Sequence, residues 1–568
     1  MMFPGHRFNS MSWFGVTLLL NLGYFPLALA NWRYKTRPDL SPPTLNITVH
    51  AKSDIGPGYL FVAPYSALPW NSPLPHGPLQ PAPYIFTSTG ELVWSGFGYF
   101  SNAFNFQAGR YKGEDVLFAF EGHRNGGKGH GHGHVKILNK NYETIKEVRG
   151  GGNALLDLHE LKIVDEKTAL VESYGPTPFE LQEYGAGPRS QWIVDAIFQE
   201  IDIETGRLLF EWNSLDHVKP DESIKPISSL KFGTGHNSSS ALDYFHLNSV
   251  DADSSHNYLI SGRHTSTLYK INGTTGSIIW RLGGKFSNFT LGPGIAFGLQ
   301  HHARWISQNP ENDTEIISLF DNSGAEIKDS GEEGEYENIS SGKIISLNTK
   351  TWTATLLQHF PAPSRDIFAA SQGSTQILPN GNALINWGSA GSITEFSPGP
   401  DPGVLFHAYL ESGELWSNSD VQNYRAFNFQ WEGVGVSGEE IAVKALRHGG
   451  STMVYVSWNG DTVTTTWRIW GVSEAGTKVG TEMGKVGKGK EVLLGEVKKE
   501  GFETSVYVKS GSDWEGFLVE AVGGEAKVLG RSRVVGIEEY VYQYVPGRDD
   551  FLSTEEGFQN ALGLGLGG

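Results

Sequence analysis

The chain has 568 residues, enough for one very large domain or two to four ordinary ones, so burying a sizeable core presents no difficulty. Lysine and arginine total 44 against 62 aspartate and glutamate, and the resulting net charge of −18 argues against nucleic acid or an anionic membrane as the main partner. Cysteine is absent, which excludes disulfides, thiolate nucleophiles and cysteine-ligated zinc. The 71 glycines and 12% aromatic residues indicate a compact, turn-rich globule that favours β structure.

The N-terminal segment is typical of a secretory signal peptide over residues 1–30. Residues 14–30 carry no charge and end in Ala28-Leu29-Ala30, the small-x-small pattern of a cleavage site. No later segment approaches about 18 uninterrupted apolar residues. We therefore expect a secreted protein without membrane attachment after cleavage, with an uncleaved signal anchor as the alternative. Six Asn-x-Ser/Thr sites agree with a glycoprotein: Asn46, Asn237, Asn272, Asn288, Asn312 and Asn338.

One short unit recurs along most of the chain: a strand-like run, a polar turn that usually ends in glycine, and a second run that often ends in tryptophan. Its six copies span residues 84–94, 135–146, 201–212, 269–280, 344–356 and 406–416. Each copy has the pattern of a β-hairpin. Because a hairpin cannot bury both faces alone, a radial array of blades is the arrangement that suits this repetition. We predict a six-bladed β-propeller over residues 31–430, with another all-β array such as stacked sandwiches as the alternative.

The pattern changes after about residue 432. Two strand-like runs, 453–458 and 463–470, flank the turn Asn459-Gly460-Asp461, and shorter runs follow at the spacing of a sandwich. These runs predict an immunoglobulin-like β-sandwich over residues 431–545. The Gly-rich and polar residues 546–568 are expected to form a disordered tail.

Ionisable residues occur within strand-like runs at four places, namely residues 157–160, 243–250, 261–266 and 299–305. Alternate residues of a strand share a face, so His246 and Asn248 are expected to point the same way, and each inner strand can aim polar groups at a common axis. The guanidinium of Arg263 offers a planar fork for a tetrahedral oxyanion. A cavity lined in this way suits a sulfate or phosphate ester.

Five runs, residues 245–251, 258–271, 275–284, 300–304 and 317–323, resemble successive signatures of the arylsulfotransferase (ASST) family in the form common in fungi. The similarity covers roughly residues 80–430. It implies a six-bladed propeller that transfers sulfate from an aryl sulfate to a phenol through a sulfated histidine, without a nucleotide donor. By match to the motifs, His301 would be the sulfated residue, and His159 would assist near the leaving or accepting phenol. The sulfate would be held by His246, Asn248 and Arg263.

One departure from the family pattern concerns the nucleophile. Fungal relatives usually have Gln-His-Asp-Ala where this chain has Gln300-His301-His302-Ala303, so both histidines are candidates. Adjacent strand residues face opposite ways, hence only one of the two can serve. The resemblance implies small-molecule partners, an aryl sulfate and a phenol, and no cofactor or metal. The alternative is a propeller that binds a ligand or partner without turnover, with structural histidines.

Three further signals in the sequence are less informative. His130, His132 and His134 alternate with glycine and would share one face if extended, which could hold Cu(II) or Ni(II), but flexible glycine spacing favours an adventitious pattern. The repeated hairpins ending in tryptophan are similar to those of quinone-dependent dehydrogenases, although no acidic Ca²⁺-binding set accompanies them. The acidic run 329–337 is expected to be a solvated loop, with Ca²⁺ binding as the alternative.

Overall fold

The computed structural model describes residues 34–67, 77–322, 340–410, 420–448, 450–473, 490–509 and 514–539. The expected signal peptide, the acidic run 329–337 and the expected tail lie outside the described residues. Strands dominate the described part of the chain, and its α1 helix (Ser214–His217) is a single turn, which confirms the all-β prediction. Among these residues, no helix combines the length and apolar character that crossing a membrane requires.

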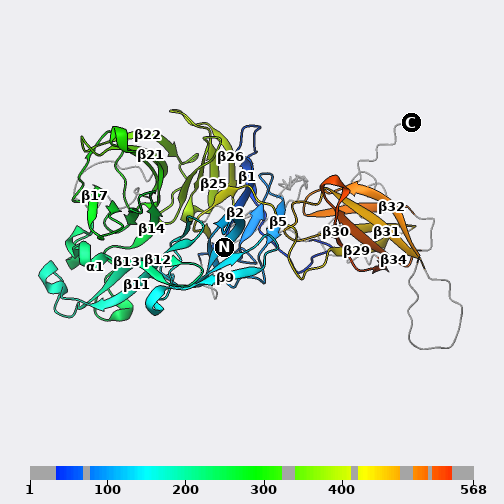
Figure 1. The fold of residues 1–568 in the computed structure, drawn as a ribbon, viewed down its shortest axis with the longest axis horizontal. Helices are drawn as coiled ribbons and strands as arrows, with labels where there is room; N and C mark the ends of the chain where they lie inside the picture. The colour runs from blue at the N-terminus through cyan, green and yellow to red at the C-terminus, as the bar shows by residue number, and fades with distance from the viewer. Residues whose placement is uncertain are drawn as a thin grey trace, which may run out of the picture.

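Six antiparallel sheets with four main strands each follow one another along the chain (Figure 1). The first contains β28 (Phe427–Phe429), β2 (Tyr59–Val62), β4 (Tyr84–Phe86) and β5 (Leu92–Ser95). The second contains β6 (Ala103–Tyr111), β7 (Glu114–Arg124), β8 (Gly131–Leu138) and β9 (Thr144–Val148). The third contains β10 (Leu161–Val164), β11 (Thr168–Pro178), β12 (Trp192–Asp202) and β13 (Leu208–Asn213).

The remaining three sheets repeat this order. The fourth contains β14 (Leu247–Ala252), β15 (Tyr258–Gly262), β16 (Thr267–Ile271) and β17 (Ile278–Gly283). The fifth contains β19 (His301–Asn309), β20 (Thr314–Asp321), β21 (Ser341–Asn348), β22 (Thr353–Pro361) and the short β18 (Thr290–Leu291). The sixth contains β23 (Ser374–Ile377), β24 (Ala383–Asn386), β25 (Ser392–Phe396), β26 (Val404–Tyr409) and β1 (Asn46–Val49).

The first strand of each sheet lies nearest the axis of the ring. Strands β6, β10, β14, β19 and β23 contact one another in succession, and β28 contacts β6. Six sheets arranged radially around these inner strands form a propeller-like array, as the recurring hairpins predict. The six inner strands therefore surround one axis. The residues where these strands begin come from distant segments of the chain and lie at the same end of that axis.

The ring is closed by pairing the two ends of its own chain. Strand β28 pairs antiparallel with β2, with Phe427 opposite Phe61, and β1 pairs with the outer strand β26. A third contact joins β3 (Pro64–Ser66) to β27 (Val421–Asn423). Because both ends contribute strands to sheets built mostly from the opposite part of the chain, the ring has no open blade edge at its seam.

Five of the six expected hairpins form the outer strand pairs of the first five blades, from β4–β5 to β21–β22. The sixth, residues 406–416, is different. Its first run is β26, but β25 and β1 pair with the two edges of that strand, and residues 411–419 lie outside the described residues. The outer hairpin of the sixth blade is therefore β25–β26. The repeat pattern predicts a following strand beside β26, but that edge is occupied by β1, which comes from the far end of the chain.

Three tryptophans that end these units are core residues, as is Trp387, which follows β24. Trp94, Trp212, Trp280 and Trp387 are at most 1% exposed. The indole of Trp280 also donates its Nε1–H to Glu315 Oε2 at 3.2 Å. Four of the six blades thus contribute a large buried aromatic surface, which stabilises the packing between sheets.

We expect Trp280→Ala to lower the free energy of unfolding by about 3–5 kcal/mol, because the truncation leaves a large cavity and an unpartnered carboxylate oxygen. The matched control is Trp352→Ala, since Trp352 is 39% exposed and should lose less than about 1 kcal/mol. Urea unfolding followed by circular dichroism measures both. Equal losses in the two variants would contradict the assignment of Trp280 to the interface between blades.

The C-terminal residues form strands that gather into a separate body beside β5 (Figure 1). One set comprises β29 (Ala442–His448), β30 (Ser451–Ser457), β33 (Glu503–Val508) and β36 (Val535–Glu539). The other comprises β31 (Thr466–Ser473), β32 (Lys490–Lys498), β34 (Gly516–Val522) and β35 (Val528–Arg531). Both sets contribute to one hydrophobic cluster, and β36 pairs with strands of each. The immunoglobulin-like topology of this region stays a prediction.

The predicted turn at Asn459-Gly460-Asp461 contacts the ring directly. The Asn459 amide both accepts from the Ser95 N–H at 2.9 Å and donates to the Ser95 carbonyl at 3.0 Å. Tyr142 donates its hydroxyl to the Gly460 carbonyl at 2.7 Å. Gly460 has a φ of +81°, and a Cβ there would lie 2.3 Å from the Tyr142 ring, so only glycine fits this contact.

Candidate functional site

A cavity of about 500 Å³ is lined by residues at the points where the chain enters the inner strands. His159 precedes β10, His246 precedes β14, His301 begins β19, Gln372 precedes β23 and Tyr424 precedes β28. Because the inner strands surround one axis, their entry points meet at one end of the ring. The topology therefore gathers side chains from five of the six blades around a single space.

Four of the five predicted site residues line this cavity: His159, His246, Arg263 and His301. Asn248 does not. It is fully buried on β14 and donates its side-chain amide to the Gln300 carbonyl at 2.7 Å. The expectation that His246 and Asn248 share a face fails because His246 lies just before β14 with a φ of +53°, so strand alternation does not extend to it.

His301 and His302 face different spaces. His301 lines the 500 Å³ cavity, whereas His302 lines a separate cavity of about 390 Å³ together with Arg304 and Phe427. His302 has a φ of +53° at an irregularity in β19 between His301 and Arg304, so the two side chains separate at a distortion of the strand and not by simple alternation. Only His301 therefore lies among the other histidines that the sequence motifs single out.

Two of the cavity imidazoles are oriented by carboxylates. His159 donates its Nδ1–H to Asp157, and His246 donates its Nδ1–H to Asp243 Oδ2 at 2.5 Å. A carboxylate only accepts, so the proton lies on Nδ1 and the neutral ring keeps a lone pair on Nε2. Burial lowers the pKa of His246 to about 4 despite the opposing charge of Asp243, which keeps this imidazole neutral at physiological pH.

His301 is oriented by an amide. Its Nδ1–H donates to Asn322 Oδ1 at 2.7 Å, and the Asn322 amide is itself fixed by donating to the Ala369 and Gln372 carbonyls. The Gln372 backbone N–H donates to His301 Nε2 over 3.2 Å. Burial first, and then the charge of Arg263, hold the pKa of His301 well below its ordinary value. His301 is thus a neutral imidazole whose Nε2 lone pair carries one long hydrogen bond.

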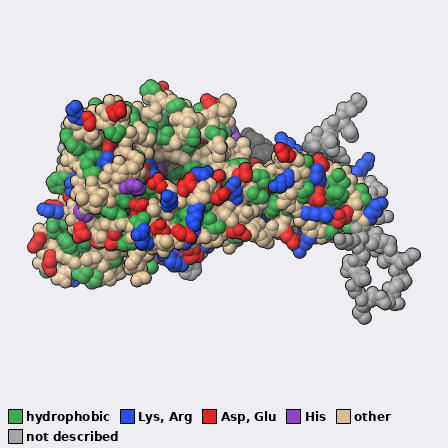
Figure 2. Space-filling model, in the orientation of Figure 1, with side chains coloured by type: hydrophobic (Ala, Val, Ile, Leu, Met, Phe, Trp, Pro, Cys, Tyr) green, Lys and Arg blue, Asp and Glu red, His purple; other side chains and the backbone are tan. Residues whose placement is uncertain are grey.

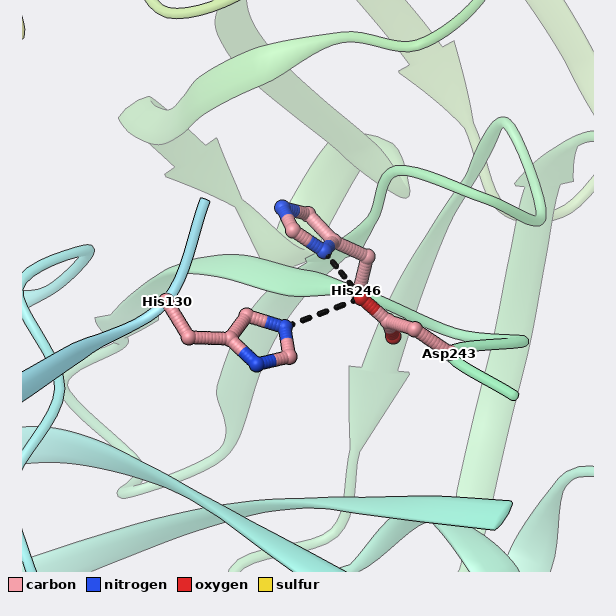
Figure 3. A group of neighbouring side chains, drawn as sticks. All are labelled: His130, Asp243 and His246. Atoms are coloured by element: carbon pink, nitrogen blue, oxygen red, sulfur yellow. Dashed lines mark hydrogen bonds and ion pairs between the residues drawn. The ribbon is translucent and has the colours of Figure 1, made fainter. Parts of the chain in front are cut away.

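Sequence reasoning missed several residues around the site. Asp243 lies in one of the polar runs, but the sequence gives no sign of its link to His130, which donates its Nε2–H to Asp243 Oδ2 at 2.9 Å (Figure 3). His130 also stacks on Tyr174 with ring centroids 3.9 Å apart. The three histidines of the Gly-His repeat lie in different surroundings. His130 is buried before β8 begins, His132 is exposed, and His134 lies 3.5 Å from Glu121.

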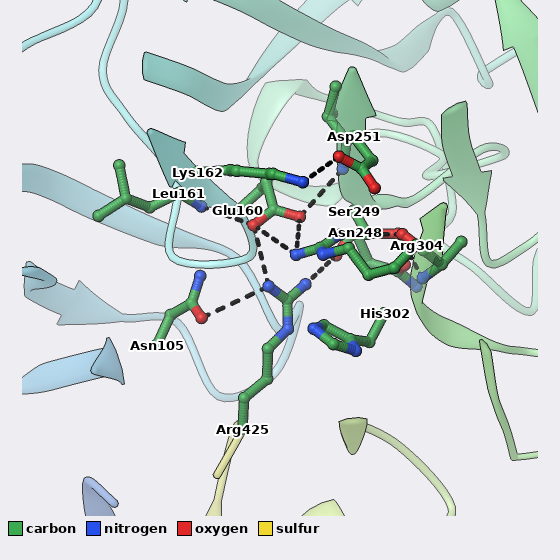
Figure 4. Close-up of polar contacts among 12 residues, drawn as sticks. Asn105, Glu160, Leu161, Lys162, Asn248, Ser249, Asp251, His302, Arg304 and Arg425 are labelled. Carbon is green, nitrogen blue, oxygen red and sulfur yellow. Dashed lines mark hydrogen bonds and ion pairs between the residues drawn. The ribbon is translucent and has the colours of Figure 1, made fainter. Parts of the chain in front are cut away.

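A buried ionic network separates the two cavities (Figure 4). Glu160, adjacent to His159, pairs with Arg304 at 2.8 Å and with Arg425 at 2.9 Å, and the Glu160 and Arg425 side chains are fully buried. Arg425 also donates to the Asn248 carbonyl at 2.7 Å. Since Arg304 lines the second cavity, this network places one carboxylate shared by two guanidinium groups between residues of the two cavities.

The network predicts how stability depends on pH. Burial alone would raise the pKa of Glu160, but Arg304 and Arg425 outweigh it and lower the pKa to about 2. A carboxyl group whose pKa is lower in the folded than in the unfolded chain stabilises the fold fully above the unfolded pKa of about 4.5. This contribution is lost as the pH falls towards the folded pKa of about 2. We expect the free energy of unfolding to decrease over this window in denaturant titrations. If Glu160 is the source of this pH dependence, the free energy of unfolding of Glu160→Gln should decrease less over the same window. An identical decrease in the variant would contradict the assignment to Glu160.

Charges around the cavity differ from those of the whole chain. The face in Figure 2 shows acidic and basic side chains interspersed over the ring. The residues that line the cavity instead include four cations, Arg124, Lys128, Lys231 and Arg263, and one carboxylate, Asp243. A locally positive space in an acidic chain is suited to an anionic small molecule.

Six radial sheets and a histidine-lined axial cavity define a β-propeller with a polar small-molecule site. A family model described as arylsulfotransferase (ASST) matches residues 107–400, more than half of the chain. The chain therefore belongs to the arylsulfotransferase family, whose activity implies small-molecule aryl substrates. No curated protein matches the chain.

Solved structures show only distant likeness. Kuenenia stuttgartiensis hydrazine synthase is 11% identical, with a TM-score of 0.30 over 56% of this chain and 70% of that one. A protein of unknown function from Bacteroides caccae is 11% identical, with a TM-score of 0.24 over 80% and 99%. An inactive virginiamycin B lyase from Staphylococcus aureus with quinupristin is 10% identical, with a TM-score of 0.25 over 62% and 92%.

Proposed function

We propose that this protein transfers a sulfuryl group from an aryl sulfate to a phenol through a sulfohistidine at His301. The observation that carries the proposal is the convergence of His159, His246, Arg263 and His301 on one cavity from three neighbouring blades, the third, fourth and fifth. Family membership supports the aryl substrate class. The fungal form of the family, seen in the sequence motifs, is part of the same proposal.

In the first step, His301 Nε2 attacks the sulfur in line with the aryl oxygen. This requires loss of the 3.2 Å hydrogen bond from the Gln372 N–H, while Asn322 keeps the ring in place. An N–S bond forms as the S–O bond to the aryl group breaks, and the electron pair leaves on the phenolate. Arg263 neutralises the sulfuryl oxygens, and His246 contributes a second donor when its Nε2 carries a proton.

The second step reverses these events on another phenol. His159, held by Asp157, has its Nε2 lone pair available to accept the phenol proton. The phenol oxygen then attacks the sulfur, and the N–S electron pair returns to His301. When protonated, the same imidazole protonates the first leaving phenolate, so the cycle is balanced in protons and predicts ping-pong kinetics.

The test is to mix the purified protein with radiolabelled p-nitrophenyl sulfate and quench it without an acceptor phenol. We expect one equivalent of p-nitrophenol to be released in a burst and the label to be recovered on His301. Adding phenol should then discharge the label as phenyl sulfate. Binding of the aryl sulfate with no labelled histidine and no transfer would favour a propeller that holds its ligand without turnover.

The cations of the cavity yield a separate prediction. Lys231 is exposed at the cavity, and Lys231→Gln is expected to raise the KM for an aryl sulfate several-fold with kcat nearly unchanged, because it weakens attraction of the anion but leaves the chemistry intact. Added salt should shrink the difference by screening. Lys350→Gln, on the exposed turn between β21 and β22, is the control. Equal KM values in Lys231→Gln and the control would contradict the role of Lys231.

We also propose that the chain is secreted and glycosylated, with a propeller over residues 31–430 and an immunoglobulin-like sandwich over 431–545. Asn237, Asn288 and Asn312, three of the six glycosylation sequons, are exposed. Exposure is what a glycan requires, and it supports export. Secretion from a eukaryotic host, followed by N-terminal sequencing and glycosidase digestion, tests cleavage after residue 30 and the modification together.

A further inference from the structure

His130, Asp243 and His246 form a compact group at the edge of the cavity (Figure 3). One ligand-type atom of each lies within 4.8 Å of the others. Asp243 Oδ2 is 2.9 Å from His130 Nε2 and 2.5 Å from His246 Nδ1. All three residues are less than 10% exposed, and they come from two separate segments of chain. Two imidazole nitrogens thus converge on one buried carboxylate.

The second oxygen of this carboxylate provides an independent observation. Asp243 is 3% exposed and lines the cavity, yet its Oδ1 has no hydrogen-bond partner among the described residues. A buried carboxylate oxygen without a partner is costly, since nothing replaces the water it has lost. Both imidazole nitrogens face Oδ2, so a cation held by the two imidazoles would remove this cost when both carboxylate oxygens bind it.

A second group, Asp157, His159 and Glu172, satisfies the same distance criterion but fits a cation less well. Both Asp157 oxygens are already used, one by the Gly131 N–H and the other by His159. Glu172 does not line the cavity. Both Glu172 oxygens also lack a hydrogen-bond partner among the described residues, so what distinguishes this group is that its open oxygens have no access to the cavity.

We propose that His130, Asp243 and His246 bind one divalent transition-metal ion of the zinc class. Two imidazole nitrogens and a carboxylate are donors that Zn²⁺, Co²⁺ and Ni²⁺ accept, whereas Ca²⁺ and Mg²⁺ prefer sets of oxygen ligands. Three protein ligands leave a coordination position for water or a ligand oxygen. Asp243 and His246 line the cavity, so this position faces it.

Metal binding would require the nitrogens that face Asp243 to be free of protons. His246 would carry its proton on Nε2 instead of Nδ1, and His130 would carry it on Nδ1 instead of Nε2, so that the nitrogens nearest Asp243 become ligands. As a consequence, His246 would present an N–H to the cavity rather than a lone pair. The metal would thereby make this wall of the cavity a better binding site for an anion. The metal site itself does not depend on sulfuryl transfer.

The experiment uses the full protein after dialysis against a chelator, titrated with ZnCl₂ by calorimetry and with CoCl₂ by visible absorption. We expect one equivalent of each ion to bind, with the intense d–d bands of four- or five-coordinate cobalt. His130→Gln and Asp243→Asn should each weaken Zn²⁺ binding by about 10-fold or more. The matched control is His132→Gln, which removes the exposed neighbouring histidine of the Gly-His repeat and should bind as the parent does.

Thermal unfolding separates loss of the site from loss of the fold. Zn²⁺ should raise the Tm of the parent and of His132→Gln, and leave the Tm of His130→Gln unchanged. If Asp243→Asn does not fold, His130→Gln and His246→Gln carry the comparison. The proposal is overturned if the parent binds no stoichiometric ion or if the control His132→Gln loses Zn²⁺ binding. It is also overturned if Zn²⁺ binding is unchanged in His130→Gln and in a second variant that folds, either Asp243→Asn or His246→Gln.

Discussion

Replacing His301 by asparagine is expected to lower kcat/KM for transfer from p-nitrophenyl sulfate to phenol on the order of 10³-fold or more. Asparagine can keep a contact with Asn322 but has no nitrogen lone pair to form a bond to sulfur. The loss should fall on kcat, because Arg263 and the other cavity cations still bind the ester. Steady-state release of p-nitrophenol measures the rate, and the labelling experiment should show no sulfated histidine.

His302→Asn is the matched control for this variant. It removes the adjacent imidazole, which lines the second cavity, and should leave transfer nearly unchanged. The pair also decides between the two candidate nucleophiles that the sequence left open. A normal rate in His301→Asn together with a large loss in His302→Asn would reverse the assignment and place the reaction in the second cavity.

Glu160→Gln is expected to lower the free energy of unfolding by about 3–5 kcal/mol, because it leaves Arg304 and Arg425 without their shared counter-charge between the cavities. Glutamine keeps one acceptor oxygen, but it carries no charge, and its NH₂ group replaces an oxygen that accepts from Arg304 with a donor. Chemical denaturation at neutral pH measures the change. The expected loss is large because Arg425 is fully buried and cannot recover its hydration without opening the ring.

The comparison variant is Glu204→Gln, which removes a carboxylate from an exposed ion pair with Lys112. Exposed pairs contribute less than about 1 kcal/mol, so this variant should stay close to the parent. If both substitutions cost the same, the axial network contributes no more than a surface ion pair. A loss confined to Glu160→Gln would show that the centre of the ring depends on its charges.

Much of the blade architecture could be predicted from the sequence because a hairpin is a local feature. The turn after Ile271 and the buried Trp280 follow from alternation and turn residues within about a dozen positions. The closing strands could not be found in this way. Strand β1 pairs with β26 across almost the whole propeller, and neither strand carries a signal that names the other.

The candidate site, too, could be predicted from the sequence only where the signal is local. The motifs identify His159, His246 and His301, and the ring topology brings them together. Asn248 was misplaced because the left-handed backbone of His246 interrupts the alternation of β14. His130 could not be linked to the site by spacing, since 113 residues separate it from Asp243. Contacts across blades are set by packing, which a pattern within one segment does not encode.

The seam of the ring also has a consequence for biosynthesis. During translation, β2 emerges early, but the strand that completes its sheet, β28, leaves the ribosome only after the other five blades have been made. For that interval the first blade exposes an unsatisfied row of backbone groups, which invites mispairing with other nascent chains. Efficient production should therefore depend on quality-control factors that shield this early strand until the last one arrives.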